Sequence, residues 1–437
     1  MSARRYDRDI LALALPALGA LAADPLVSLI DTAFVGRLGP VPLAALGVNV
    51  SVFSFAFVIF NFLAYGTTPM VGTALGRRDV DGAGRLVAHA FFLAVVAGGI
   101  ALGVLQAFAG PILQAMGAGG ELMAPAAGYL RVRALAGPAL LIITAANGAF
   151  RGFQDTRTPL RVSVAVAAAN LVLDPLFIFA FGWGLQGAAW ATTLAQWLGA
   201  CTFLALVYGR NRRAWRVPWT VPSWPELTPF LRVGWALLIR TFALIATMTA
   251  ATAVAARVGV VDVAAHQVAA QLWLFLALIV DALAIAAQAL VARYVGEGKA
   301  KEARAVSDRL LVLGLGVGAV LGVAFWVGRV WLAGLFSDDA VVVARILAVF
   351  PFVAAMQPLN ALVFVWDGVF MAIQDFSFLA VAMVLSALAA AALLAPVLSL
   401  GLGLAGVWWA LVGLMATRAL TLAWRYRPAA GAFRRAG

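Results

Sequence analysis

The chain has 437 residues, of which 64% are hydrophobic and only 11% are charged. Soluble globular proteins carry charge on about a quarter of their residues, so this composition excludes a soluble fold and indicates a polytopic membrane protein. The net charge of +12 does not indicate nucleic acid, because the basic residues lie in short segments between apolar runs. We therefore expect the lipid bilayer as a partner and no bound nucleic acid.

The apolar runs recur along the whole chain, and each is long enough for a helix of about 20 residues to cross the hydrocarbon core. Outer-membrane barrels use alternating strands of about ten residues instead, so the pattern predicts an all-α membrane protein. Twelve transmembrane helices are predicted, at residues 10–36, 43–74, 86–110, 124–150, 160–182, 186–208, 229–256, 263–294, 308–335, 341–371, 377–399 and 404–424.

Arginines concentrate before the first span and after the second, fourth, sixth, eighth and twelfth spans, whereas the opposite set of breaks holds few. The positive-inside rule then predicts that both termini are cytoplasmic. We also expect a multi-pass protein of the plasma (inner) membrane. The chain has a single cysteine and two distant histidines, which excludes a disulfide framework and argues against zinc. We expect no cofactor and no metal site.

An internal repeat appears when the chain is compared with itself at an offset of 220 residues. Residues 37–45 then match residues 257–265, and Pro138 meets Pro358. One shared offset over such a distance indicates two homologous halves of six helices each.

The repeat predicts three segments: an N-terminal six-helix lobe at residues 1–208, a cytoplasmic linker at 209–228 and a C-terminal six-helix lobe at 229–437. Because six is even, both lobes enter the membrane in the same orientation and are related by a pseudo-twofold axis along the membrane normal. Repeats of this kind are typical of transporters.

Positions where the repeat breaks identify groups that the fold does not require. The first half carries two aspartates and a helix-bending proline that the second half lacks. The pairs are Asp31 with Ala251, Asp174 with Leu394, and Pro16 with Ala236. Since a charge at the centre of a membrane helix is costly, each such aspartate is a functional candidate.

Asn170 and Asp174 are four residues apart and share one face of a helix, and Pro175 follows directly. Together with Asp31 and Thr192 they could form a hydrogen-bonded polar pocket inside the first lobe. Two carboxyl groups in a low dielectric favour uptake of a proton, so the pocket is a candidate proton site. The alternative is a satisfied structural cluster. Asp24, on the same helix as Asp31, fits either interpretation.

The second half offers a different set of charges, which forms a candidate second site. Arg240 and Asp281 lie at similar depth on adjacent spans, so we favour a structural ion pair over a direct role in transport. Asp367 has no obvious partner in the sequence and is the stronger functional candidate of the three.

At this point the sequence resembles the multidrug and toxic compound extrusion (MATE) transporters, and within them the DinF-like branch that includes plant organic-anion exporters. The resemblance covers nearly the whole chain. Its most specific stretches are residues 23–39, 147–160, 170–175, 264–268, 281–292 and 360–370. It implies twelve helices in two lobes, a V-shaped central cavity, alternating access, and export driven by inward flow of H⁺ or Na⁺.

The resemblance also implies roles for individual residues. The cation pocket of the first lobe would comprise Asp31, Asn147, Asn170, Asp174 and Thr192, and the first helix would bend at Pro16 on protonation. Another branch carries an acidic residue on the seventh helix, where this sequence has Arg240. That departure favours protons over Na⁺ as the coupling ion.

The sequence thus predicts a monomeric antiporter, not an enzyme, that exports small molecules such as drug-like cations or organic anions in exchange for protons. The alternatives are a Na⁺-coupled exporter and a lipid-linked precursor flippase of the same superfamily. Flippases of that kind usually have two further helices, so twelve spans favour the exporter.

Overall fold

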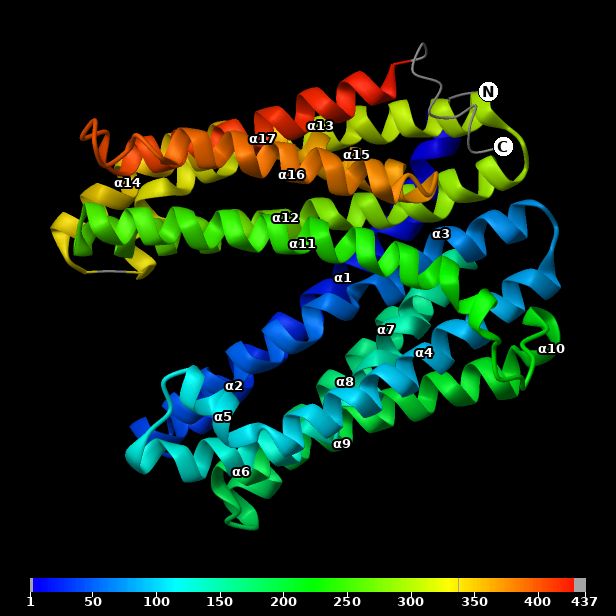
Figure 1. Ribbon diagram of the computed structural model, residues 1–437, viewed down its shortest axis with the longest axis horizontal. Helices are drawn as coiled ribbons and strands as arrows, with labels where there is room; N and C mark the ends of the chain where they lie inside the picture. The colour runs from blue at the N-terminus through cyan, green and yellow to red at the C-terminus, as the bar shows by residue number, and fades with distance from the viewer. Residues whose placement is uncertain (1–2, 337, 428–437) are drawn as a thin grey trace. The chain divides into compact units, whose positions relative to one another are not determined.

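The computed structural model describes residues 3–336 and 338–427, and within them the chain is helical with short connections and no strands (Figure 1). A helix satisfies all backbone hydrogen bonds within its own segment, which a chain surrounded by lipid requires. The predicted all-α fold is confirmed.

The first half contains the elements up to the connection between the two halves (Figure 1). In chain order they are α1 (Ala3–Gly36), α2 (Pro40–Val58), η1 (Ile59–Asn61), α3 (Phe62–Gly76), α4 (Val80–Ala107), α5 (Ala109–Ala115), η2 (Gly120–Leu122), α6 (Met123–Ala134), α7 (Gly137–Gly152), α8 (Arg157–Pro175), η3 (Leu176–Ala180), α9 (Gly184–Leu204), η4 (Ala205–Arg210) and α10 (Arg212–Trp215).

The second half is built from longer, less interrupted helices. They are α11 (Trp224–Val258), α12 (Val260–Gly296), α13 (Ala300–Phe336), α14 (Ala340–Ala355), α15 (Gln357–Ala372), α16 (Phe376–Leu394) and α17 (Gly403–Tyr426).

Among the described residues, ten helices are long and apolar enough to cross a membrane, and the number becomes twelve if each of two bent pairs is one span. The bent pairs are α6 with α7, at 47°, and α14 with α15, at 48°. Pro138 and Pro358 lie in the first turns of α7 and α15, where proline fits because that turn needs no intrahelical donor. The fourth span of each half is therefore bent at the same place.

Small residues allow these bent spans to pack closely against a neighbour. A Cβ atom on Gly148 of α7 would lie 2.8 Å from the Ala64 carbonyl oxygen of α3. A Cβ atom on Gly368 of α15 would lie 2.5 Å from the Ala284 carbonyl oxygen of α12. Gly148 and Gly368 are repeat partners, so both halves use the same close helix contact.

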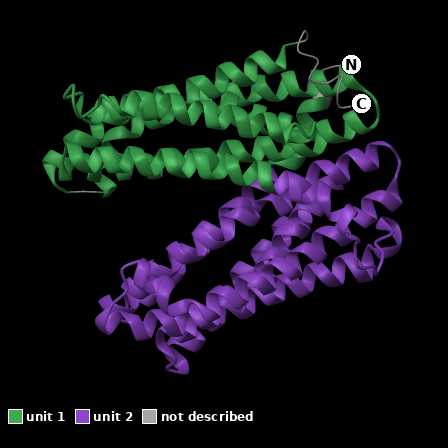
Figure 2. Cartoon of the chain, viewed as in Figure 1, with its two compact units in different colours: residues 1–14, 235–437 green, residues 15–234 purple. Residues whose placement is uncertain are grey.

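The chain divides into two compact units, which Figure 2 colours separately. Unit 2 comprises residues 15–234, and unit 1 comprises residues 1–14 together with 235–437. This division differs from the predicted lobes at 1–208 and 229–437 with a linker at 209–228. The start of α1 packs with the second half, and the linker packs with the first.

An ion pair explains the placement of the first residues in unit 1. The Arg309 guanidinium on α13 donates two hydrogen bonds to the Asp7 carboxylate, at 2.6 and 2.8 Å. Such a bidentate pair fixes orientation as well as distance. The interaction joins groups 302 residues apart and ties the beginning of α1 to the second half.

The segment between the halves is folded against unit 2. Trp215 is buried, and its ring stacks on Phe153 at a centroid distance of 3.8 Å. The backbone beside it approaches α4 so closely that a Cβ atom on Gly84 would lie 2.4 Å from the Trp215 carbonyl oxygen. Arg216 then pairs with Asp81 at 2.9 Å. The predicted linker is thus an anchored part of unit 2.

We expect Gly84→Ala to destabilise the protein by about 1–3 kcal/mol, because the added methyl group would force the anchored backbone away from α4. Thermal unfolding of the purified protein in detergent measures the effect. Gly99→Ala on the same helix is the matched control, since its Cβ would meet nothing within 4 Å. Equal melting temperatures for the two variants would contradict the close contact.

Candidate functional site

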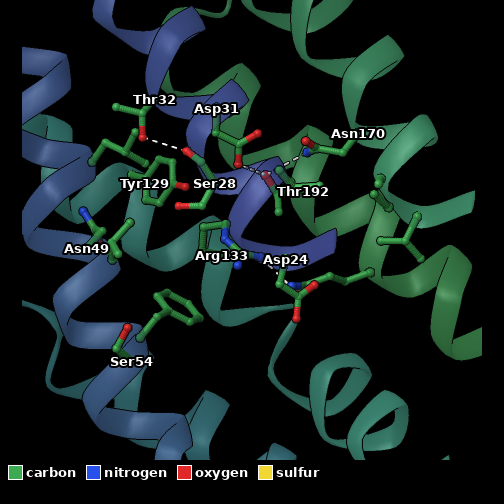
Figure 3. Close-up of a pocket in the computed structure, with 18 of the residues that line it drawn as sticks. Asp24, Ser28, Asp31, Thr32, Asn49, Ser54, Tyr129, Arg133, Asn170 and Thr192 are labelled. Atoms are coloured by element: carbon green, nitrogen blue, oxygen red, sulfur yellow. Dashed lines mark hydrogen bonds between the residues drawn. The ribbon is translucent and has the colours of Figure 1, made fainter. Parts of the chain in front are cut away.

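Unit 2 contains a cavity of about 250 Å³ among α1, α2, α6, α8 and α9, with several polar side chains in its wall (Figure 3). α1 contributes Asp24, Ser28 and Asp31 to its wall, and α8 and α9 contribute Asn170 and Thr192. The cavity lies within one six-helix half, where the sequence predicted a polar pocket.

Asn170 joins the two predicted carboxylates. In the amide orientation that satisfies both of its ends, Nδ2 donates to Asp31 Oδ1 at 2.8 Å and to Asp174 Oδ2 at 3.1 Å. Its Oδ1 then accepts a hydrogen bond from Thr192 Oγ1 at 3.1 Å. Thr192 also lies 3.4 Å from Asp31 Oδ2. Four of the five residues predicted for the cation pocket are therefore in contact.

The local sequence explains how these groups are positioned. Asn170 and Asp174 are one helical turn apart on α8 and are both buried. The helix ends at Pro175, after which the chain continues as the π-helical turn η3. π-Helical turns often accompany functional sites in membrane helices and elsewhere. Asp31 and Thr192 approach the pair from α1 and α9.

The centre of the arrangement consists of two carboxyl groups and one neutral amide donor. Two ionised carboxylates that share one neutral amide donor repel each other strongly in a low dielectric. Within the described part of the chain, Asp174 Oδ1 is buried and has no hydrogen-bond partner. A proton or one univalent cation would relieve the repulsion, so the cluster is chemically suited to bind and release a cation.

Two further cavity residues were missed by the sequence analysis. Arg133 of α6 donates from Nη1 to Gln196 Oε1 at 3.1 Å, and its guanidinium lies 4.8 Å from the centre of the Phe53 ring. Tyr129, one turn earlier on α6, lines the same cavity. A signal was present, because Arg133 is a charge inside a predicted span and its repeat partner is Val353.

Asn147 and Pro16 lie elsewhere. Asn147 is on α7 and is not part of the cavity wall, and its Oδ1 has no partner among the described residues. Its role in the cation pocket stays a prediction. Pro16 lies directly after the boundary at which α1 passes into unit 2, and the helix continues through both Pro16 and Pro25.

In unit 1 the structure corrects the expectation that Asp367 has no partner. Asp367 Oδ2 accepts hydrogen bonds from Arg240 Nη2, at 2.6 Å, and from Arg418 Nη2. Arg418 was overlooked, although it is a charge inside the last predicted span. Asp281 also takes part in an interaction, and the predicted Arg240–Asp281 pair stays a prediction. The cluster holds α11, α15 and α17 together.

The described residues contain no group of three or more His, Cys, Asp or Glu side chains placed to hold a metal ion. The carboxyl, amide and hydroxyl oxygens around Asp31 are hard ligands, of the kind that a proton or an alkali cation prefers.

We expect Asp367→Asn to lower the free energy of unfolding by about 3–5 kcal/mol, because it removes the carboxylate that pairs with the buried Arg418 and the half-buried Arg240. Asp31→Asn is the matched control, since it removes a carboxylate from a cluster with surplus negative charge and should not destabilise the fold. Thermal unfolding in detergent compares the two. A loss for Asp31→Asn as large as for Asp367→Asn would refute the assignment of Asp367 to structure.

Comparisons with known proteins agree with this architecture. A family model described as MatE matches the chain twice, at residues 16–176 and 237–397, once in each half. Protein DETOXIFICATION 44, chloroplastic, of Arabidopsis thaliana is 37% identical over 440 residues, which cover 96% of this chain and 82% of the relative. A probable multidrug resistance protein NorM of Rhizobium meliloti (strain 1021) is 28% identical over 448 residues, which cover 96% of this chain and 93% of the relative.

A solved structure shows the same fold. The crystal structure of MATE in the bent conformation superposes with a TM-score of 0.90 at 21% identity and covers 98% of this chain and 96% of that one. The repeat, the helical architecture and the family match agree with one another. The chain therefore belongs to the MatE family, and it is a multi-pass membrane transporter of the multidrug and toxin efflux class and not an enzyme.

Proposed function

We propose that the protein is a proton-coupled antiporter that exports small organic molecules by alternating access. The observation that carries this proposal is the Asn170 amide that bridges the Asp31 and Asp174 carboxylates at the wall of a cavity. One proton completes this cluster, and loss of the proton restores the repulsion. The cluster can therefore favour different conformations when it is loaded and when it is empty.

The membrane potential supplies enough free energy to drive such a change of conformation. Each unit charge that moves inward across 100 mV releases about 2.3 kcal/mol, enough to bias two states that differ by a few kcal/mol. In the proposed cycle, protonation at Asp31 or Asp174 changes how α1 packs, and α1 bends at Pro16. The cavity then contracts and favours release of substrate outward.

Arg133 supports protons over Na⁺. Its guanidinium interacts electrostatically with both Asp31 and Asp174, so one fixed cation already neutralises part of their charge. A proton needs only one carboxylate oxygen, whereas Na⁺ needs several oxygen ligands and would have to approach that guanidinium. A Na⁺-coupled exporter is the alternative, because Thr192 and Asn170 supply suitable oxygens.

Several finer features belong to the same proposal. The protein would be a monomer of the DinF-like branch in the plasma (inner) membrane, with both termini cytoplasmic, as the arginine distribution indicates. Its substrates would be drug-like cations or organic anions. The described spans number ten to twelve, which favours an exporter over a lipid-linked precursor flippase with two additional helices.

We expect Asp31→Asn and Asp174→Asn to abolish efflux driven by a pH gradient, because neither amide can bind and release the coupling proton. The measurement uses proteoliposomes with an imposed pH or Na⁺ gradient and follows a cationic dye and citrate. Both variants should retain the elution profile of the folded wild type.

Asp24→Asn is the comparison variant, since it removes the same charge from the same helix but not from the Asn170 network. It should keep its dependence on the pH gradient. Wild-type efflux in both network variants would refute the proposal. Efflux driven by a Na⁺ gradient alone would show that the coupling ion is Na⁺ and not H⁺.

A further inference from the structure

The connection between the halves forms a basic hollow on the surface of unit 2. The hollow has a volume of about 820 Å³ and is lined by Tyr208, Gly209 and Val217 together with four arginines. The arginines are Arg210, Arg212, Arg213 and Arg216. Four guanidiniums around one concave surface are typical of a site for an anion that carries phosphate.

These arginines are held on a fixed backbone. Trp215 lies in their midst and is buried against Phe150 and Phe153. Gly84 of α4 allows the backbone at residues 215–216 to make close contact. Because the segment is anchored, its arginines converge without the ordering cost that a flexible linker would incur.

Three of the guanidiniums are not neutralised by protein groups. Arg216 pairs with Asp81 at 2.9 Å. In the described parts of the chain, Arg210, Arg212 and Arg213 have no carboxylate partner, and Arg212 lies over the ring of Trp219 at 5.7 Å. The hollow therefore keeps a surplus of positive charge that an external anion would neutralise.

The surroundings of the hollow indicate that the anion is attached to a lipid. The segment directly follows the sixth span, which ends at Arg210, and precedes the seventh, which begins at Trp224. Trp219, Val221 and Trp224 beside it are 67%, 79% and 72% exposed. Exposed tryptophans are typical of the membrane interface, and basic residues next to a span attract anionic lipids.

We propose that this hollow, formed by Tyr208, Gly209, Val217 and the four arginines, binds the headgroup of an anionic phospholipid. The arginines would hold the phosphate, and Trp219 and Trp224 would lie at the level of the glycerol backbone and upper acyl chains. A soluble phosphate-bearing anion shares the headgroup chemistry, but it would make no use of the exposed apolar residues.

The test compares Arg210→Gln/Arg212→Gln/Arg213→Gln with a control that loses the same charge from the same predicted face. Arg77→Gln/Arg78→Gln/Arg161→Gln is that control, because these arginines are exposed but do not line the hollow. Native mass spectrometry counts bound phosphatidylglycerol, and thermal unfolding in detergent is measured with added phosphatidylglycerol, phosphatidylcholine or inorganic phosphate.

We expect the wild type and the control to retain one more phosphatidylglycerol than the hollow variant and to be stabilised by it, while phosphatidylcholine has little effect. The anchor at Trp215 is unchanged, so all three proteins should unfold alike without lipid. Equal retention by the hollow variant, or an equal loss by the control, would refute the site. Stabilisation by inorganic phosphate equal to that by phosphatidylglycerol would refute a lipid ligand.

Discussion

A charge inside the hydrocarbon layer is stable only if an opposite charge, a set of hydrogen bonds or a proton neutralises it. The two halves of this chain satisfy that constraint in different ways. In unit 1, Asp367 accepts hydrogen bonds from two guanidiniums of the protein, those of Arg240 and Arg418. In unit 2, Asp31 and Asp174 share the neutral amide of Asn170, and in the proposed mechanism a proton completes the cluster. One half of a repeated scaffold thus holds a fixed charge cluster, and the other holds the two carboxyl groups that we propose to exchange a proton.

The helical spans could be predicted because bilayer thickness and the internal repeat leave few alternatives. Even the bends after Ala134 and Ala355 follow from repeated prolines. The assignment of residues 1–14 to the second half could not be predicted, since it depends on contacts such as Asp7 with Arg309, far apart in the sequence. The fold of the connection between the halves could not be predicted either. Its prolines and arginines are typical of a loop, whereas one tryptophan, Trp215, anchors it.

The candidate site was predicted in part. Asn170 and Asp174 are close in sequence, so helix geometry fixes their relation, and the break in the repeat identifies Asp31. Arg133 satisfies the same criterion, because it is a charge inside a predicted span and its repeat partner is Val353. The partners of Asp367 could not be derived, since the reach of a long arginine side chain depends on the packing of three helices. Asn147 rested on family resemblance alone and lies outside the cavity wall.

The boundaries between the units lie after residue 14 and after residue 234. They fall at equivalent points of the repeat, within α1 and within α11, each of which is one continuous helix. Each half therefore begins with a short stretch of helix that completes the core of the other half. This is the pattern of reciprocal segment exchange, as in domain-swapped dimers. A six-helix half produced alone would lack a piece of its own core, so the two halves are interdependent folding units.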